Sequence, residues 1–168
     1  MKTIISIDPG AKGFISIRED DTIDYVSIIE VDRKGLAEIF RELKKKYSDN
    51  KNVIVVMEEV HAIYGSSAKA TFSFGSTFGF LLGLIMANNF PFALVQPKEW
   101  QKEVWVNLDK VYRYGDGKKT IDTKETSIAA AMRIFPNEDL RRSQRCKTID
   151  DNKADSLLIG EYARRRNL

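Results

Sequence analysis

Four acidic residues stand where they could bind divalent cations and hydrolyse a phosphodiester. Asp8 and Glu58 each end an apolar run, and Asp151 and Asp155 come just before the apolar stretch 157–159. A carboxylate at the end of a buried strand is costly to desolvate unless a cation neutralises it. If these side chains converge, they form an oxygen-rich site for Mg²⁺, of the kind that hydrolyses phosphodiesters with two metal ions.

The first two acidic positions also have simpler explanations. Asp8 precedes Pro9-Gly10, which is typical of an ordinary turn, although a glycine there also lets a phosphate approach the backbone. Glu58 is followed by Glu59, and side chains alternate along a strand, so only one of the two can face a shared metal. A pair of glutamates at a strand end is often simply solvated.

The last two acidic residues are four positions apart, which places them on one face of a helix, about 5–6 Å from each other. Two like charges at that separation destabilise a helix unless they share a cation. The helix dipole favours acidic residues in the first turn, which explains Asp151. It does not explain Asp155, which lies one turn deeper between Ala154 and Leu157.

The basic residues form short runs although the net charge is only +3. These runs are residues 44–46, 118–119, 141–147 and 164–166. Any one run is typical of a solvated surface, but several around an acidic centre could hold a phosphate backbone. The single cysteine excludes an intrachain disulfide and, with the single histidine, a zinc site of those residues. We expect a cytoplasmic protein without a signal peptide.

The apolar periodicity predicts a mixed α/β domain that spans residues 1–168 without a linker. Three short strands form an antiparallel meander, and a strand buried on both faces follows a helix. The strands are expected at 3–8, 13–18, 23–30, 53–58 and 92–96. The helices are expected around 36–47 and 66–89, from 97, and at 123–135 and 152–166. Residues 106–122 are expected to form a mobile polar loop, and 137–149 an irregular segment.

The helix expected at 66–89 carries glycines at positions 75, 79 and 83. Glycine weakens a helix by roughly 1 kcal/mol, so three on one face indicate close backbone approach, either to the sheet or to a second subunit. The apolar stretch 78–86 is too short and too rich in glycine for a membrane span, so no membrane association is expected.

Five motifs in order resemble those of the RuvC family of Holliday junction resolvases, in its bacteriophage-type branch. They are residues 6–10, 57–62, 95–100, 124–136 and 151–158. The bacterial pattern has its last two acids three apart, with an aspartate where Asn152 stands here. Asp151 would therefore serve as the third ligand, with Asp150 and Asn152 as open alternatives.

The resemblance implies an RNase H-like fold, in which helices flank both faces of a five-stranded mixed sheet, and a homodimer. It implies two Mg²⁺ ions, replaceable by Mn²⁺, held by Asp8, Glu58, Asp151 and Asp155. The activity would be cleavage of Holliday junctions and related branched DNA with 5′-phosphate products, in recombination, repair or phage genome debranching. Alternatives are a broader fork and flap nuclease and a non-catalytic branched-DNA binder. An ATP-binding actin-like protein would need two domains, for which the chain is too short.

Further residues are expected to contact DNA around this site. Lys124 would balance charge at the reacting phosphate. Phe72 and Phe74 either pack in the core or stack on unpaired bases. The remaining candidates for DNA contact are Tyr64, Lys98, Lys102, Lys118, Lys119, Arg141 and Arg142.

Overall fold

A mixed sheet of five strands forms the centre of the structure, a computed structural model that describes residues 2–48, 52–59, 67–115 and 117–168. The strand order is β3-β2-β1-β4-β5. The strands are β1 (Thr3–Ile7), β2 (Phe14–Glu19), β3 (Thr22–Ser27), β4 (Val53–Glu58) and β5 (Phe92–Val95). The predicted mixed sheet and its antiparallel meander, β1-β2-β3, are confirmed.

Strand direction brings separate parts of the chain to one edge of the sheet. β4 pairs in parallel with β1 on one side and with β5 on the other. All five residues of β1 and the first five of β4 are buried, as expected for strands covered on both faces. Because Ile7 of β1 is in register with Met57 of β4, both strands end at the same edge.

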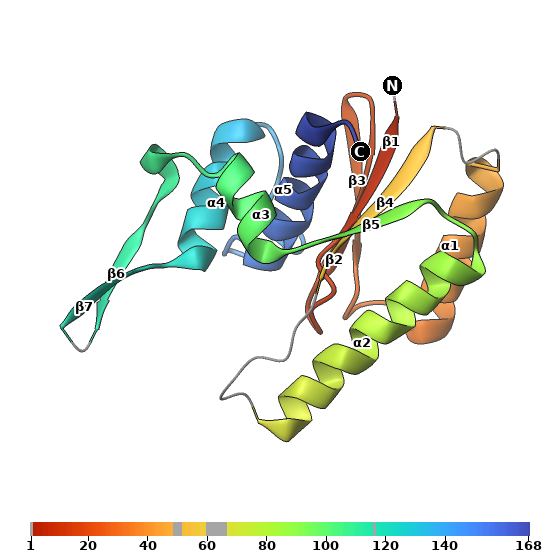
Figure 1. Ribbon diagram of the computed structural model, residues 1–168, viewed down its shortest axis with the longest axis horizontal. Helices are drawn as coiled ribbons and strands as arrows, with labels where there is room; N and C mark the ends of the chain where they lie inside the picture. Colours follow the sequence, from red (N-terminus) through yellow and green to blue (C-terminus); the bar gives the residue numbers. More distant parts are fainter. Residues whose placement is uncertain (1, 49–51, 60–66, 116) are drawn as a thin grey trace.

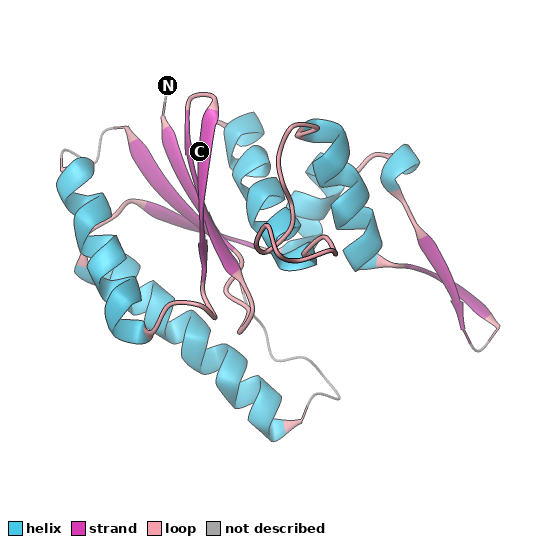
Figure 2. Ribbon diagram, turned by 180° about the vertical axis from the view of Figure 1, so that it is seen from behind, coloured by secondary structure: helices cyan, strands magenta, loops and turns pink. Residues whose placement is uncertain are grey.

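Helices cover both faces of the sheet, as predicted (Figures 1 and 2). The helices α1 (Arg33–Lys46) and α2 (Ala68–Ala87) lie on one face. The other face carries α3 (Pro97–Val104), α4 (Thr123–Ile134) and α5 (Asp151–Arg166). Each face has its own apolar core, one around Phe40 and Leu81 and one around Trp100 and Leu158.

Helix α5 lies directly against the first two strands. A Cβ added to Gly160 would come 2.7 Å from Ser6 Oγ, so only glycine allows this approach. One turn earlier, Ser156 Oγ lies 2.6 Å from Ser16 Oγ in a buried hydrogen bond. These contacts fix the height of α5 over the sheet and therefore the position of its N-terminal turn.

Helix α2 is mostly exposed, and its glycines do not pack against the sheet, which was one of the two expected explanations for them. A Cβ at Gly75, Gly79 or Gly83 would meet nothing within 4 Å. The helix is also long and apolar enough by composition to cross a membrane, with a mean hydropathy of 1.6 over a window that is 11% buried. The expectation that this segment is too short for a span was therefore wrong, because the apolar stretch extends further towards the N-terminus than 78–86.

The segment expected to be a mobile loop is instead a short helix and a hairpin. A 3-10 turn, Asn107–Asp109, precedes β6 (Tyr112–Gly115) and β7 (Lys118–Ile121). All the residues of both strands are exposed, so neither shows the apolar alternation by which strands are usually predicted. The segment 137–149 is irregular, as predicted.

Candidate active site

The two acidic residues at the ends of the parallel strands lie next to each other. Asp8 directly follows β1, and Glu58 is the last residue of β4, one position beyond the Ile7–Met57 pair. Asp8 is only 7% exposed, and its Oδ1 accepts a hydrogen bond of 3.1 Å from the Gly10 amide. Glu58 Oε1 accepts one of 2.9 Å from the indole Nε1 of Trp100, which fixes the orientation of this carboxylate.

Helix α5 adds two more carboxylates at the same place. Asp151 begins the helix and Asp155 follows one turn later, on the face directed towards the sheet edge. The Oδ1 atom of Asp155 is fully enclosed and has no hydrogen-bond partner among the described residues. Ser127, from α4, donates a hydrogen bond to the Asp155 carboxyl group. An enclosed carboxylate oxygen without a donor is costly unless a cation binds there.

Burial and the charges of neighbouring carboxylates act on the pKa values of this group of acids. Burial, followed by the charges of Glu58, Asp151 and Asp150, raises the pKa of Asp8 to about 7, against the opposing Gly10 hydrogen bond. Burial and then the charge of Asp8 raise the pKa of Asp155 well above its ordinary value. Burial also raises the pKa of Glu58, although the Trp100 hydrogen bond lowers it. Such a cluster of mutually repelling acids favours a bound cation.

Lys124 is the cation that the protein itself supplies to this cluster. Its Nζ lies 2.8 Å from Asp151 Oδ2, while its side chain remains 71% exposed. The hydrogen bond to Asp151, followed by the charge of that residue, raises the pKa of Lys124, and Asp155 contributes a smaller effect. A lysine at the rim of an acidic site can neutralise an approaching phosphate.

Asp150 is part of the framework of the site. Burial raises its pKa, but hydrogen bonds from Asn152 and Arg142 outweigh that effect and lower it. One oxygen accepts from Asn152, and the other from Arg142 at 2.8 Å. Both oxygens of the Asp150 carboxylate, which caps α5, are engaged within the protein, whereas Asp151 pairs with the exposed Lys124.

Arg142 is engaged within the protein. Besides Asp150, its guanidinium donates 2.7 Å hydrogen bonds to Ser27 Oγ and to the Lys12 carbonyl oxygen, and it lies 4.6 Å from the Phe14 ring. These contacts join the turn after Asp8 to the N-terminus of α5. Arg141, by contrast, pairs with Asp139 and has a side chain that is 41% exposed. The expected DNA contacts of both residues stay predictions, and for Arg142 this geometry leaves little of the side chain available.

The described residues contain no group of three or more acidic, histidine or cysteine side chains already arranged around a metal position. The donor set nevertheless fits a hard cation, because it is made of carboxylate oxygens that repel one another and includes the unpaired Asp155 Oδ1. Two of these carboxylates already have partners within the protein, since Trp100 donates to Glu58 and Lys124 pairs with Asp151.

The remaining residues that were predicted to contact DNA differ in their exposure and in their position relative to this site. Lys98 and Lys102 are exposed on α3, which follows β5 at the same sheet edge. Phe72 is 79% exposed, so the core-packing alternative was wrong for it, while Phe74 is half-buried. Tyr64 lies outside the described residues. Sequence reasoning assigned no role to Trp100, Ser127 or Gly160, and Trp100 was detectable as the last residue of the 95–100 motif.

Comparisons with known proteins support the fold. No family model matches the chain, and no curated protein matches it in sequence. A structure of T. thermophilus RuvC in complex with a Holliday junction substrate matches with a TM-score of 0.55 at 12% identity, covering 99% of this chain and 96% of that one. A second Thermus thermophilus RuvC structure gives 0.53 at 14% identity, with 98% and 96% coverage. The protein thus has the RNase H-like fold in its RuvC-like form.

Proposed function

We propose that this chain is a metal-dependent, structure-selective endonuclease that cleaves Holliday junctions and related branched DNA. The observation that carries the proposal is the meeting of Asp8, Glu58, Asp151 and Asp155 at one edge of a RuvC-like sheet, with one oxygen of Asp155 enclosed and unpaired. The RuvC structure that shares this fold is a complex with a Holliday junction substrate. The chemistry of the acidic cluster and that substrate point to the same reaction.

Each residue of the cluster has a definite task in this proposal. Asp8, Glu58, Asp151 and Asp155 would hold two Mg²⁺ ions, or Mn²⁺ in their place. Bound ions would supply an activated water and charge stabilisation for the leaving 3′ oxygen, which gives 5′-phosphate ends. Trp100 donates to Oε1 of Glu58 and would thereby orient this carboxylate for metal binding. Lys124 would release Asp151 and donate to the phosphate as DNA arrives.

Asp151 is our choice for the third ligand. The Asp150 carboxylate is saturated by Arg142 and Asn152, and Asn152 donates its amide to the neighbouring aspartate. Replacing Asp151 with asparagine should abolish cleavage, and replacing Asp150 should mainly destabilise α5. If the Asp150 variant lost cleavage while keeping its melting temperature, the assignment of the two residues would be reversed.

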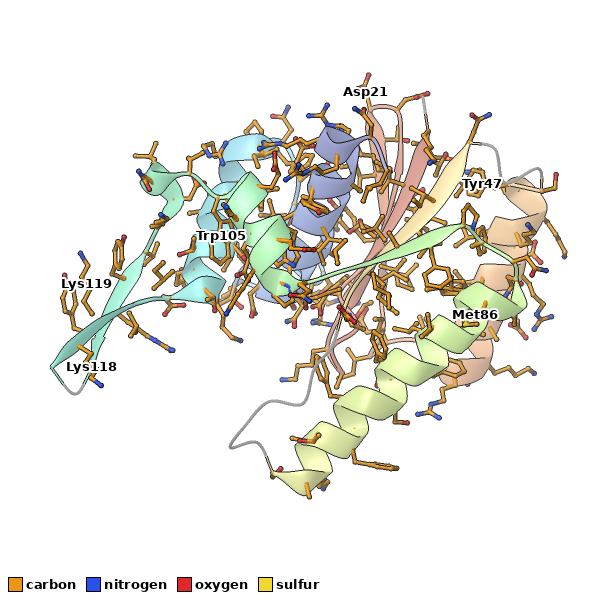
Figure 3. All side chains as sticks on the ribbon, viewed as in Figure 1. Asp21, Tyr47, Met86, Trp105, Lys118 and Lys119 are labelled. Atoms are coloured by element: carbon orange, nitrogen blue, oxygen red, sulfur yellow. The ribbon has the colours of Figure 1, made fainter. Side chains whose placement is uncertain are left out.

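We also propose that the active form is a homodimer paired through α2. Phe72 and Met86 on this helix are 79% and 58% exposed, and its glycines leave room for a second backbone. Met86 is labelled on α2 in Figure 3. Glycine at four-residue spacing lets two helices approach closely. A symmetric dimer would place two acidic sites on one junction, as paired incisions require. The same dimer would explain the apolar composition of α2, because the second copy would cover its apolar face.

The test is a cleavage assay with the purified chain. Labelled four-way, Y-shaped and linear DNA should be incubated with Mg²⁺, with Mn²⁺ and with EDTA, and any cuts mapped. We expect metal-dependent cuts near the branch point of the four-way junction and none in linear DNA. The Asp8→Asn variant should bind the junction at least as tightly as the native chain and should not cut it. Cleavage retained by that variant would refute the proposed site.

The same assay separates the alternatives. Equal cleavage of four-way and Y-shaped DNA would favour a broader fork and flap nuclease, and tight binding without cleavage in any metal would favour a non-catalytic binder. We place the protein in the cytoplasm, in recombination, repair or the debranching of phage DNA, where such junctions arise. These last assignments rest on the resemblance of its motifs.

A further inference from the structure

The hairpin of β6 and β7 is an arm that extends away from the body of the protein, with a depression on its surface. In Figures 1 and 2 it points outwards beyond α3 and α4, and every described residue of its two strands is exposed. Gly117 at its tip has a φ of +71°, a left-handed conformation that favours glycine in tight hairpin turns. Two strands of four residues reach about 13 Å.

The base of the hairpin is held firmly. Asp109, just before it, is buried and receives two hydrogen bonds of 2.8 Å from the Arg133 guanidinium on α4. At the start of α4, the Thr126 hydroxyl accepts from the Val111 amide at 3.1 Å. The Asp122 amide donates to the Val111 carbonyl oxygen at 2.8 Å and closes the two strands. An exposed hairpin on such a base keeps a defined direction.

The two faces of the hairpin differ in chemistry. Strand pairing places Tyr112 opposite Ile121 and Tyr114 opposite Lys119 on one face, where Lys119 Nζ lies 4.0 Å above the Tyr112 ring. Pairing places Arg113 on the other face together with Lys118, which lies near the tip (Figure 3). A depression between these basic residues is also lined by Tyr114, Gly115 and Thr120. The charge and the hydroxyl groups suit a phosphate backbone.

The hairpin begins next to the acidic cluster. Only Asp122 and Thr123 separate the end of β7 from Lys124, whose Nζ is bound to Asp151. A strand whose scissile phosphate lies at the carboxylates and touches Lys124 would therefore continue towards the hairpin. Measured along the helix axis, the phosphates of one strand of a duplex are spaced by about 3.4 Å, so a reach of about 13 Å in that direction spans about four phosphates.

We infer that the β6–β7 hairpin binds the backbone of a duplex arm of the substrate, about four phosphates from the cleaved bond, through Arg113 and Lys118. This inference rests on the proposed function and names the part of the substrate that the hairpin contacts. A duplex arm is favoured over a second copy of the chain because the exposed face is basic. It is favoured over unpaired bases because two basic side chains and the Thr120 hydroxyl line the depression, with Tyr114 as its one aromatic residue, while Tyr112 is covered by Lys119 on the other face.

The test compares Arg113→Ala/Lys118→Ala with Lys34→Ala/Arg41→Ala, which removes the same two charges from exposed positions of α1 on the opposite side of the sheet. Binding to a four-way junction is measured in EDTA, where no strand is cut, over a range of salt. We expect the hairpin variant to bind roughly 10-fold more weakly and to reduce the slope of log K against log salt by about two. The α1 variant should change neither, and both should keep the melting temperature of the native chain.

Neutral methylphosphonates locate the contact. Placed three to six phosphates from the mapped cut, they should weaken native binding and leave the hairpin variant unaffected, whereas the same number at the end of the arm should weaken neither protein. If no cut is found, a methylphosphonate scan along the arm serves the same purpose. The inference would be overturned if the hairpin variant cut DNA at the native rate and showed the same slope of log K against log salt as the native chain. The proposed function would then remain intact.

Two further outcomes would also overturn it. Loss of affinity for single strands but not for duplex arms would assign the hairpin to unpaired bases, in which case Tyr114→Ala should reproduce the loss. Dissociation of the dimer by Arg113→Ala/Lys118→Ala, measured by sedimentation without DNA, would assign it to a second copy. A last outcome separates the two proposals. If the hairpin variant bound the junction more weakly and with a smaller salt dependence, but the native chain cut no DNA, the role of the hairpin would be supported and the nuclease activity rejected.

Discussion

Helices α2 and α5 have burial opposite to what their compositions suggest. α2 is the apolar helix, yet among its 20 residues only Leu81 and Ile85 are buried. α5 is rich in charge, yet ten of its 16 residues are buried. The difference shows that the neighbours of a helix, and not its mean hydropathy, decide how much of it leaves water.

Helix α5 can be buried because its polar groups have partners. Lys153 Nζ donates to the Asp139 carbonyl oxygen at 2.6 Å and to that of Arg141 at 3.2 Å. Hydrogen bonds and ion pairs link Glu161 to Arg18, Arg164 and Arg165, and they lower its pKa to about 2 although burial acts in the opposite direction. Asp155 differs, since one of its oxygens is enclosed and has no hydrogen-bond partner in the part of the chain that the structure describes. Asp155 is therefore the residue of α5 whose proposed function is tested first.

The largest expected effect tests the role of Asp155. Asp155→Asn should lower cleavage by more than about 100-fold, since loss of residues that merely support metal ligands typically costs 10–100-fold. In EDTA the same variant should melt at a higher temperature, because a repelled, buried carboxylate is removed. Cleavage within 10-fold of the native rate would show that Asp155 is a structural residue of α5.

The exposed helix gives the next largest effect. Gly79→Arg places a long charged side chain where two α2 helices would meet, and we expect a dimer at micromolar concentration to become a monomer by sedimentation. The monomer should keep the melting behaviour of the isolated fold because the position is open in one chain. Arg41→Ala, on α1, is the control. A native chain that is already monomeric would contradict the dimer and leave the apolar face to another partner.

The anchor of α5 can be tested with two adjacent arginines. Arg142→Ala removes the link between Asp150, Ser27 and the Lys12 carbonyl oxygen and should lower the free energy of unfolding by about 2–3 kcal/mol, as Asp150 loses its partner. Arg141→Ala, whose ion pair with Asp139 lies at the surface, should change stability far less than Arg142→Ala. Chemical denaturation measures both. If both substitutions lowered the free energy of unfolding by the same small amount and weakened DNA binding equally, Arg142 would be assigned to DNA binding as first predicted.

Alanine at two glycines compares the helices directly. Gly160→Ala forces a Cβ towards Ser6 Oγ and should destabilise the protein by about 1–3 kcal/mol. Gly79→Ala meets open space and should stabilise a single chain by up to about 1 kcal/mol. Thermal melts at low concentration test this pair. If both substitutions destabilised the protein equally, α2 would be packed as tightly as α5.

The smallest effect is a pH dependence of stability without metal. The folded pKa of Asp8 is about 7, against an ordinary value of 3.8, so the folded state retains a proton that the unfolded state has released. Stability contributed by that proton is lost as pH rises from about 4 to about 7 and changes little above. Melting temperatures in EDTA should fall over this range more steeply for the native chain than for Asp8→Asn. Mg²⁺ should remove the difference, and parallel curves in EDTA would contradict the raised pKa.

The sequence was informative where apolar periodicity or motif order carried the signal. The five strands and five helices were expected near their observed bounds because buried elements need apolar residues at period 2 or 3.6. Asp8, Glu58 and Asp151 were expected because each stands at the end of such an element, and Asp155 because it follows Asp151 by four residues on the same helix face. The hairpin was missed because both of its faces are exposed, and the Asp116-Gly117 pair between Tyr114 and Lys118 was its available signal.

The sequence by itself determined which segments become strands and helices and which carboxylates stand at their ends, because these follow from local periodicity and from neighbours along the chain. Only the tertiary structure decided that Asp150 is saturated by Arg142 while Asp155 is not saturated, that Gly160 rather than Gly79 touches the sheet, and that the apolar α2 is left open. Contacts of this kind join residues more than a hundred positions apart in several cases. They depend on the distance between packed surfaces, which no local pattern of residues records.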